Sequence, residues 1–85
     1  MAALSTEDAG RIIGSLTEQV PDPQAIVAHR RTDPDLRRLV AAMVPGDQLW
    51  EWHWSGRLGV RDAYSIGYCI VRDRWVVDSH CHSSG

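Results

Sequence analysis

This sequence has no long apolar run, no lysine and only two cysteines. A transmembrane helix needs about 20 consecutive apolar residues, and no window here approaches that length. A small secreted domain that depends on disulfides usually carries at least about four cysteines, whereas this chain has only Cys69 and Cys81. Its first residues turn acidic at once and lack the basic start and apolar run of a signal peptide. We therefore expect a soluble, cytoplasmic protein with reduced thiols and no membrane partner.

The charge pattern excludes a strongly basic surface. All nine basic residues are arginines, and the formal net charge is −2. Arginine without lysine is more typical of a GC-rich bacterial genome than of a selected function, so we expect a small bacterial protein. The arginines at 30–31 and 37–38 lie next to Asp33 and Asp35, which neutralise much of their charge. Because a nucleic-acid footprint needs a clearly basic patch, we expect no nucleic acid as partner.

What the chain does have is tryptophan. The 85 residues fit one domain, 1–85, whose core is small. Each of the four tryptophans can bury about 150–250 Å². Three of them alternate along the stretch Trp50-Glu51-Trp52-His53-Trp54. Strand residues alternate between the two faces of a sheet, so this stretch predicts a strand whose three indoles share one face.

The N-terminal half predicts helices. Ser5 and Asp8 have the spacing of a capping box, and apolar residues recur at helical spacing from Ala9 to Val20. A helix is therefore expected to begin near Ser5 and to end at Pro21. Two Asp-Pro pairs then mark further helix starts, each with aspartate as the cap and proline in the first turn.

The first pair, Asp22-Pro23, predicts a short helix at Gln24–Arg30, although the apolar run inside it also fits an extended segment. The second pair, Asp33-Pro34, predicts a helix with a buried apolar stripe. Pro45-Gly46-Asp47 ends that helix and turns the chain into the tryptophan strand.

The C-terminal half predicts strands. Residues 63–72 and 75–82 are rich in β-branched and aromatic side chains. Asp73-Arg74 predicts a tight turn between them, strained or longer because Arg74 stands where glycine is usual. Residues 55–62 predict a mobile connection or a wide hairpin loop, and residues 83–85 a frayed tail. The fold class is therefore α+β, with two or three N-terminal helices packed on one face of a three-stranded antiparallel β-meander.

The hydrophobic pattern also predicts a register. Pairing Ile70 with Val77 and Tyr68 with Ser79 gives one apolar face, whereas a one-residue slip places Asp78 and His80 beside Ile70 and Tyr68. We therefore prefer the first register and bury the three indoles on its apolar face. The opposite face, open to solvent or to a partner, then carries the candidate binding residues Glu51, His53, Cys69, Asp78, His80 and His82.

Two kinds of chemistry fit that face, and a third interpretation gives it no function. Cysteine, histidine and carboxylate are zinc ligands, and the candidate ligands are Cys69, Asp78, His80 and His82, although no Cys-x-x-Cys or His-Glu-x-x-His motif is present. Cys69 with His80 could form a nucleophile and base, but no catalytic signature surrounds Cys69. A solvated outer face without any function is the simplest alternative.

We therefore expect no enzyme and no cofactor. The sequence favours a small accessory or interaction protein that acts through a protein partner, because tryptophan and arginine are enriched at binding hot spots. The alternative is a zinc-binding protein that uses the histidine and cysteine face. Formation of a homodimer, either through a sheet edge or through the polar face, also fits this fold.

Overall fold

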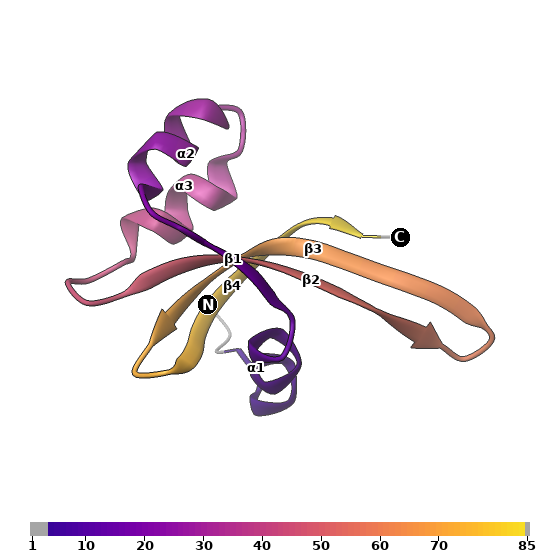
Figure 1. Cartoon of the computed structure of the whole chain (residues 1–85). Helices are drawn as coiled ribbons and strands as arrows, with labels where there is room; N and C mark the ends of the chain where they lie inside the picture. Colours follow the sequence, from indigo (N-terminus) through magenta and orange to yellow (C-terminus); the bar gives the residue numbers. More distant parts are fainter. Residues whose placement is uncertain (1–3, 85) are drawn as a thin grey trace.

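The computed structural model describes residues 4–84, apart from the side chains of Leu58 and Ser84. Within them the chain forms three helices and one four-stranded antiparallel sheet with strand order β1-β2-β3-β4 (Figure 1). The α+β class is confirmed, and the sheet has one strand more than we predicted. The elements are α1 (Thr6–Ile13), β1 (Leu16–Val20), α2 (Pro23–His29), α3 (Pro34–Ala41), β2 (Gln48–Leu58), β3 (Arg61–Arg72) and β4 (Trp75–Ser84).

The additional strand, β1, comes from a segment that we had placed in the first helix. Gly14 caps the C-terminus of α1, and Leu16–Val20 then pairs antiparallel with β2. The apolar spacing of residues 16 and 20 fits a helix as well as a strand. Pairing with the tryptophan strand decides between the two, because tertiary contacts routinely override helix propensity.

The helix starts follow the predicted caps. The Ser5 hydroxyl accepts a hydrogen bond from the Asp8 N–H, and the carboxylates of Asp22 and Asp33 accept from the third residue after each. Pro23 and Pro34 stand at the first helical positions. None of the helices in the described residues is long and apolar enough to span a membrane.

Both connections between the long strands are two-residue turns. Asp73 and Arg74 adopt φ values of 52° and 66°, as a type I′ hairpin turn requires at both positions. The predicted tight turn is thus confirmed without glycine. Leu58 pairs with Arg61, so only Gly59 and Val60 connect β2 to β3. The mobile loop predicted for residues 55–62 is wrong, because these residues extend the hairpin, which projects beyond all three helices (Figure 1).

The sheet register differs from the predicted one in two places. Trp50 pairs with Cys69 and Glu51 with Tyr68, so the indoles share their face with Cys69 and Val71 rather than with Tyr68. Between β3 and β4, Ile70 pairs with Asp78 while Val71 pairs with Val76, which leaves an extra residue in β4. This bulge places Asp78 opposite Ile70 and His80 opposite Tyr68, which is the register that we had rejected.

A second irregularity follows between the partners of Ile66 and Gly67, and β4 then continues to Ser84, where a frayed tail was expected. Gly85 lies outside the described residues.

Helices cover both faces of the sheet, whereas we predicted one. β1 runs along the sheet edge and carries the chain from α1 on one face to α2 and α3 on the other (Figure 1). The core is therefore split in two. The α1 side buries Ala9, Ile12, Trp52, Cys69, Val71 and Val76. The α3 side buries Leu36, Leu39, Val40, Leu49, Tyr68 and Ile70.

Candidate functional site

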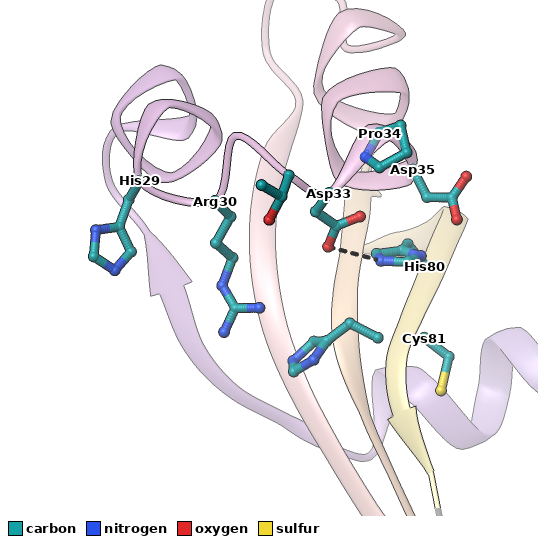
Figure 2. A pocket seen from close by; sticks show the side chains of 9 residues that line it. His29, Arg30, Asp33, Pro34, Asp35, His80 and Cys81 are labelled. Carbon is teal, nitrogen blue, oxygen red and sulfur yellow. Dashed lines mark hydrogen bonds and ion pairs between the residues drawn. The ribbon is translucent and has the colours of Figure 1, made fainter.

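An open polar groove lies between the α2–α3 connection and β4. It encloses about 580 Å³. Figure 2 shows Arg30 pointing from the end of α2 toward the sheet, with Asp33 and His80 facing each other and His29 directed away from them. The groove is lined by His29, Arg30, Thr32, Asp33, Pro34, Asp35, His80, Cys81 and His82.

The centre of the groove is a pair formed by His80 and Asp33. Their Nε2 and Oδ2 atoms are 3.2 Å apart, and the side chains are only 14% and 19% exposed. Asp33 also accepts the α3 cap bond from the Leu36 N–H at 3.1 Å. One carboxylate therefore holds the start of α3 and β4 at the same time.

Asp33 is ionised at neutral pH. Burial by itself raises the pKa of this carboxyl, but the hydrogen bonds from Leu36 and His80 and the electrostatic effect of His80 and Arg30 outweigh it, so the pKa is lowered overall. An ionised carboxylate can only accept hydrogen bonds. Nε2 of His80 is therefore the donor in this pair.

Tyr68 forms the floor beside this pair. Its ring stacks with that of His82 at a centroid distance of 5.7 Å, and the Arg30 guanidinium lies 5.6 Å from the ring centroid. The ring is almost fully buried. Burial is the main reason that the pKa of Tyr68 is raised, and the charge of Arg30 partly offsets it. The phenol therefore stays neutral and serves as a platform for two cationic or polar side chains.

Five of the six predicted site residues share this face of the sheet. Glu51 and His53 reach it from β2, paired with Tyr68 and Ile66, and three more reach it from β4. These three are Asp78, His80 and His82. The face is not fully open as predicted, because α2 and α3 cover the part next to Tyr68 and Ile70.

Asp78 is accommodated on this face by a local hydrogen bond. Its Oδ1 atom accepts from the N–H of Ser79 at 2.8 Å. Placing Asp78 opposite Ile70 therefore leaves its carboxylate with a partner instead of unsatisfied, and His80, opposite Tyr68, has Asp33. We had rejected this register because it places Asp78 and His80 beside apolar residues. These hydrogen-bond partners largely remove the energetic cost of that placement.

Cys69 is the sixth predicted residue, and the structure places it on the opposite face. Its side chain is fully buried within the α1-side core. Burial raises the pKa of its thiol to about 12. Cys69 therefore cannot act as a nucleophile with His80, and that catalytic hypothesis is wrong.

The zinc hypothesis loses a ligand for the same reason. Without Cys69, the remaining candidates are Asp78, His80 and His82, and His80 is already bonded to Asp33. Among the described residues, no group of three or more histidine, cysteine, aspartate or glutamate side chains is placed to hold a metal ion.

Sequence reasoning missed Arg30, Asp33 and Tyr68 as site residues. Asp33 was recognised only as a helix cap and Tyr68 only as core, while Arg30 was grouped with solvated arginines. The signal that connects them is His80. In the structure His80 lies opposite Tyr68 on a partly covered face, where a histidine requires a polar partner. The predicted register placed His80 on an open face, so no partner was sought among the helix caps.

Beyond the groove, the same face stays uncovered along the β2–β3 hairpin. His53 and Tyr64 meet edge to face there, with ring centroids 6.5 Å apart. His53 is exposed and Tyr64 is 42% exposed, while Ile66 is half-buried. We call the surface formed by Arg30, His53, Tyr64, Ile66 and His82 the open face.

No protein-family model, no curated protein and no solved structure matches this chain significantly.

Proposed function

We propose that this chain is a small non-enzymatic accessory protein that binds another protein through the open face. The observation that carries the proposal is the exposure of His53 and Tyr64 on a strand hairpin that none of the three described helices covers. Tyrosine and arginine are enriched among residues that dominate binding energies. A surface held by strands also loses little conformational entropy when it binds.

The composition of the open face supports a protein partner. It combines an exposed aromatic ring, a half-buried aliphatic side chain and two histidines, with Arg30 at the groove end. This mixture of apolar and polar groups resembles the rim and core of ordinary protein interfaces. Asp33 and Asp35 lie beside Arg30 and Arg38, so the surface lacks the uniform positive charge that a nucleic acid requires.

The two acids of the groove, Asp33 and Asp35, have structural partners. Asp33 bonds to His80 and to the α3 backbone, and Asp35 lies 3.5 Å from Arg38. The buried thiol of Cys69 is on the far side of the sheet. These contacts favour a binding role for the face over a catalytic one.

The test is affinity capture from extracts of the source organism with matched variants. Tyr64→Ala and His53→Ala remove side chains of the open face. Val44→Ala is the control, because Val44 is similarly exposed, at 49%, and belongs to the connection between α3 and β2. We expect one protein to be retained by the wild type and by Val44→Ala, and lost with both open-face variants.

A captured protein is then purified and its affinity measured by calorimetry against the same variants. Self-association is measured first by analytical ultracentrifugation, since a second copy of the chain is also a protein partner. Equal affinity for wild type and Tyr64→Ala would contradict the proposal, as would capture that depends on Val44 instead.

A further inference from the structure

The distal part of the β2–β3 hairpin has an edge that no described element occupies. β1 pairs with β2 only as far as Trp52, and the His53 N–H adds one bond to the Ser15 carbonyl. From Trp54 to the turn, the described chain pairs β2 with β3 alone, and this part of the hairpin projects beyond the three helices (Figure 1). On the opposite edge, β4 pairs with β3 as far as Ser65. A two-stranded hairpin without further cover is only marginally stable in water.

The backbone groups on this free edge belong to Ser55 and Arg57. In an antiparallel strand, successive residues direct both backbone polar groups alternately to the two neighbouring strands. The His53 N–H and the Glu51 carbonyl, which accepts from the Thr17 hydroxyl at 3.1 Å, both point to the β1 side. The β2–β3 register is regular from 48 to 58, so the N–H and C=O groups of residues 55 and 57 point the same way. Both residues are exposed.

We propose that this edge pairs with the same edge of a second copy, in an antiparallel arrangement whose two-fold axis passes through Gly56. The free stretch, residues 54–58, is bounded by β1 at one end and by the turn at the other, and a second copy presents a stretch with the same length and spacing. Ser55 then lies opposite Arg57 of the second copy, and Arg57 opposite its Ser55. All the free N–H and C=O groups of these residues gain partners, and the interface is isologous, as in most homodimers.

Neighbouring registers fail on geometry or on charge. A shift by one residue brings an outward-pointing residue opposite an inward-pointing one, and the hydrogen bonds are lost. A shift by two residues in one direction places two copies of Arg57 directly opposite each other, and such like-charged pairs destabilise a sheet. The opposite shift needs the His53 N–H, which the Ser15 carbonyl already holds. In the proposed register each Arg57 faces a serine and keeps its own Asp62 at 3.3 Å.

The dimer places the two open faces side by side. Ser55 and Arg57 alternate with Trp54 and Gly56 along β2, so they lie on the face that carries His53. Directly opposed residues of antiparallel strands project to the same side of a sheet. The joined sheet therefore presents the open face twice, and its formation requires no side chain of that face.

The experiment is sedimentation of the full chain from micromolar to millimolar concentration, with reductant present because Cys81 is exposed. We expect a reversible dimer. Arg57→Pro removes the outward N–H, and proline is tolerated on a strand edge whose N–H faces solvent. Since each dimer contains this N–H twice, the variant should weaken dimerisation at least about tenfold. Arg57→Ala is the matched control, because it removes the side chain, keeps the N–H and should dimerise like the wild type.

Amide hydrogen exchange on the ¹⁵N-labelled wild type locates the contact even if Arg57→Pro fails to fold. The N–H groups of Ser55 and Arg57 should exchange slowly at high protein concentration and rapidly after dilution. The Gly56 N–H points to β3 and should change much less. Exchange at Ser55 and Arg57 that is independent of concentration would contradict the proposal.

The other outcomes are equally decisive. A chain that stays monomeric over the whole range overturns the proposal, and so does a dimer that is as tight with Arg57→Pro as with Arg57→Ala. A dimer that is lost with His53→Ala but kept with Arg57→Pro lies on the open face and overturns it too. Arg57→Pro retains every side chain of the open face, so capture of a protein partner by this variant tests the proposed function separately from dimerisation.

Discussion

The imidazole of His80 lies 3.2 Å from the carboxylate of Asp33, so the last strand is bonded to the residue that caps α3. This contact spans 47 positions of sequence and fixes the α2–α3 pair against β4. Arg30 and the ring of Tyr68 lie beside this pair, so the contact also holds the groove end of the open face in place.

Removing either partner should therefore destabilise the fold to different extents. His80→Ala leaves Asp33 its cap bond but not its histidine, which should lower the free energy of unfolding by about 1–3 kcal/mol. Asp33→Ala loses the cap as well, worth about 1 kcal/mol more. Urea unfolding of both single variants and the double variant measures the coupling. Strictly additive effects would show that the 3.2 Å contact contributes nothing.

The ion pair of Asp47 with Arg72 should control stability in acid. Two hydrogen bonds from the Arg72 guanidinium, with one from the Val44 N–H, lower the pKa of Asp47 from 3.8 to about 2. A carboxyl with a depressed folded-state pKa stabilises the protein above its unfolded value and loses that contribution as pH falls. The stabilisation should thus be complete above about pH 5 and disappear between pH 4 and pH 2.

The measurement for Asp47 is the urea midpoint at several pH values between 6 and 2. Asp47→Asn should unfold at lower urea near neutrality and lose less stability than the wild type on acidification. Asp33, whose pKa is also lowered, contributes a similar slope in both proteins and cancels from the difference. Parallel pH profiles would refute the assignment to Asp47.

The two cysteines should differ sharply in reactivity. Burial raises the pKa of the Cys69 thiol to about 12, whereas Cys81 is exposed. Since the thiolate is the reactive form, a disulfide reagent at pH 8 should modify Cys81 alone in the native protein and both residues in urea. Cys81→Ser should leave almost no reactivity under native conditions. Rapid native labelling of that variant would mean that the α1-side core opens readily.

Gly67 should be intolerant of any side chain. A Cβ atom there would stand less than 2 Å from the carbonyl oxygen of His80, which is backbone and cannot move aside without breaking the β3–β4 pairing. Gly67→Ala should cost about 3 kcal/mol or more, at the upper end of overpacking effects. Gly14→Ala is the control, because its nearest atoms are at 3.7 Å, and its effect should be within about 0.5 kcal/mol. Thermal unfolding of both variants compares them directly.

Local signals in the sequence predicted local structure well. The caps at Ser5, Asp22 and Asp33 each require only a side chain and an N–H three residues later, and all three are formed. The strand Leu16–Val20 was missed because its identity depends on a partner strand that is distant in the sequence, with Val20 paired to Leu49 and Leu16 to Trp52. Short apolar segments carry no local signal that separates a strand from the end of a helix.

The predicted face was nearly right because two errors cancelled. Our register was wrong by one residue between β2 and β3, and the bulge at Val77 shifts β4 by one residue against β3. β2 and the part of β4 from Asp78 onward therefore keep the relative faces that we predicted, while β3 is inverted. Cys69, the one site residue on β3, was consequently the one misplaced. A bulge adds a residue without a sequence signal of its own, so hydrophobic alternation alone could not have located it.

The two irregularities in β4 also affect how the chain meets its neighbours. β4 is a ten-residue strand at the edge of the sheet, and a long regular edge is a template for the addition of further strands. Its backbone is interrupted near Val77 and again near His82. An incoming strand with ordinary spacing could match only short stretches between these points. The two irregularities therefore make this outer strand a poor template for strand addition.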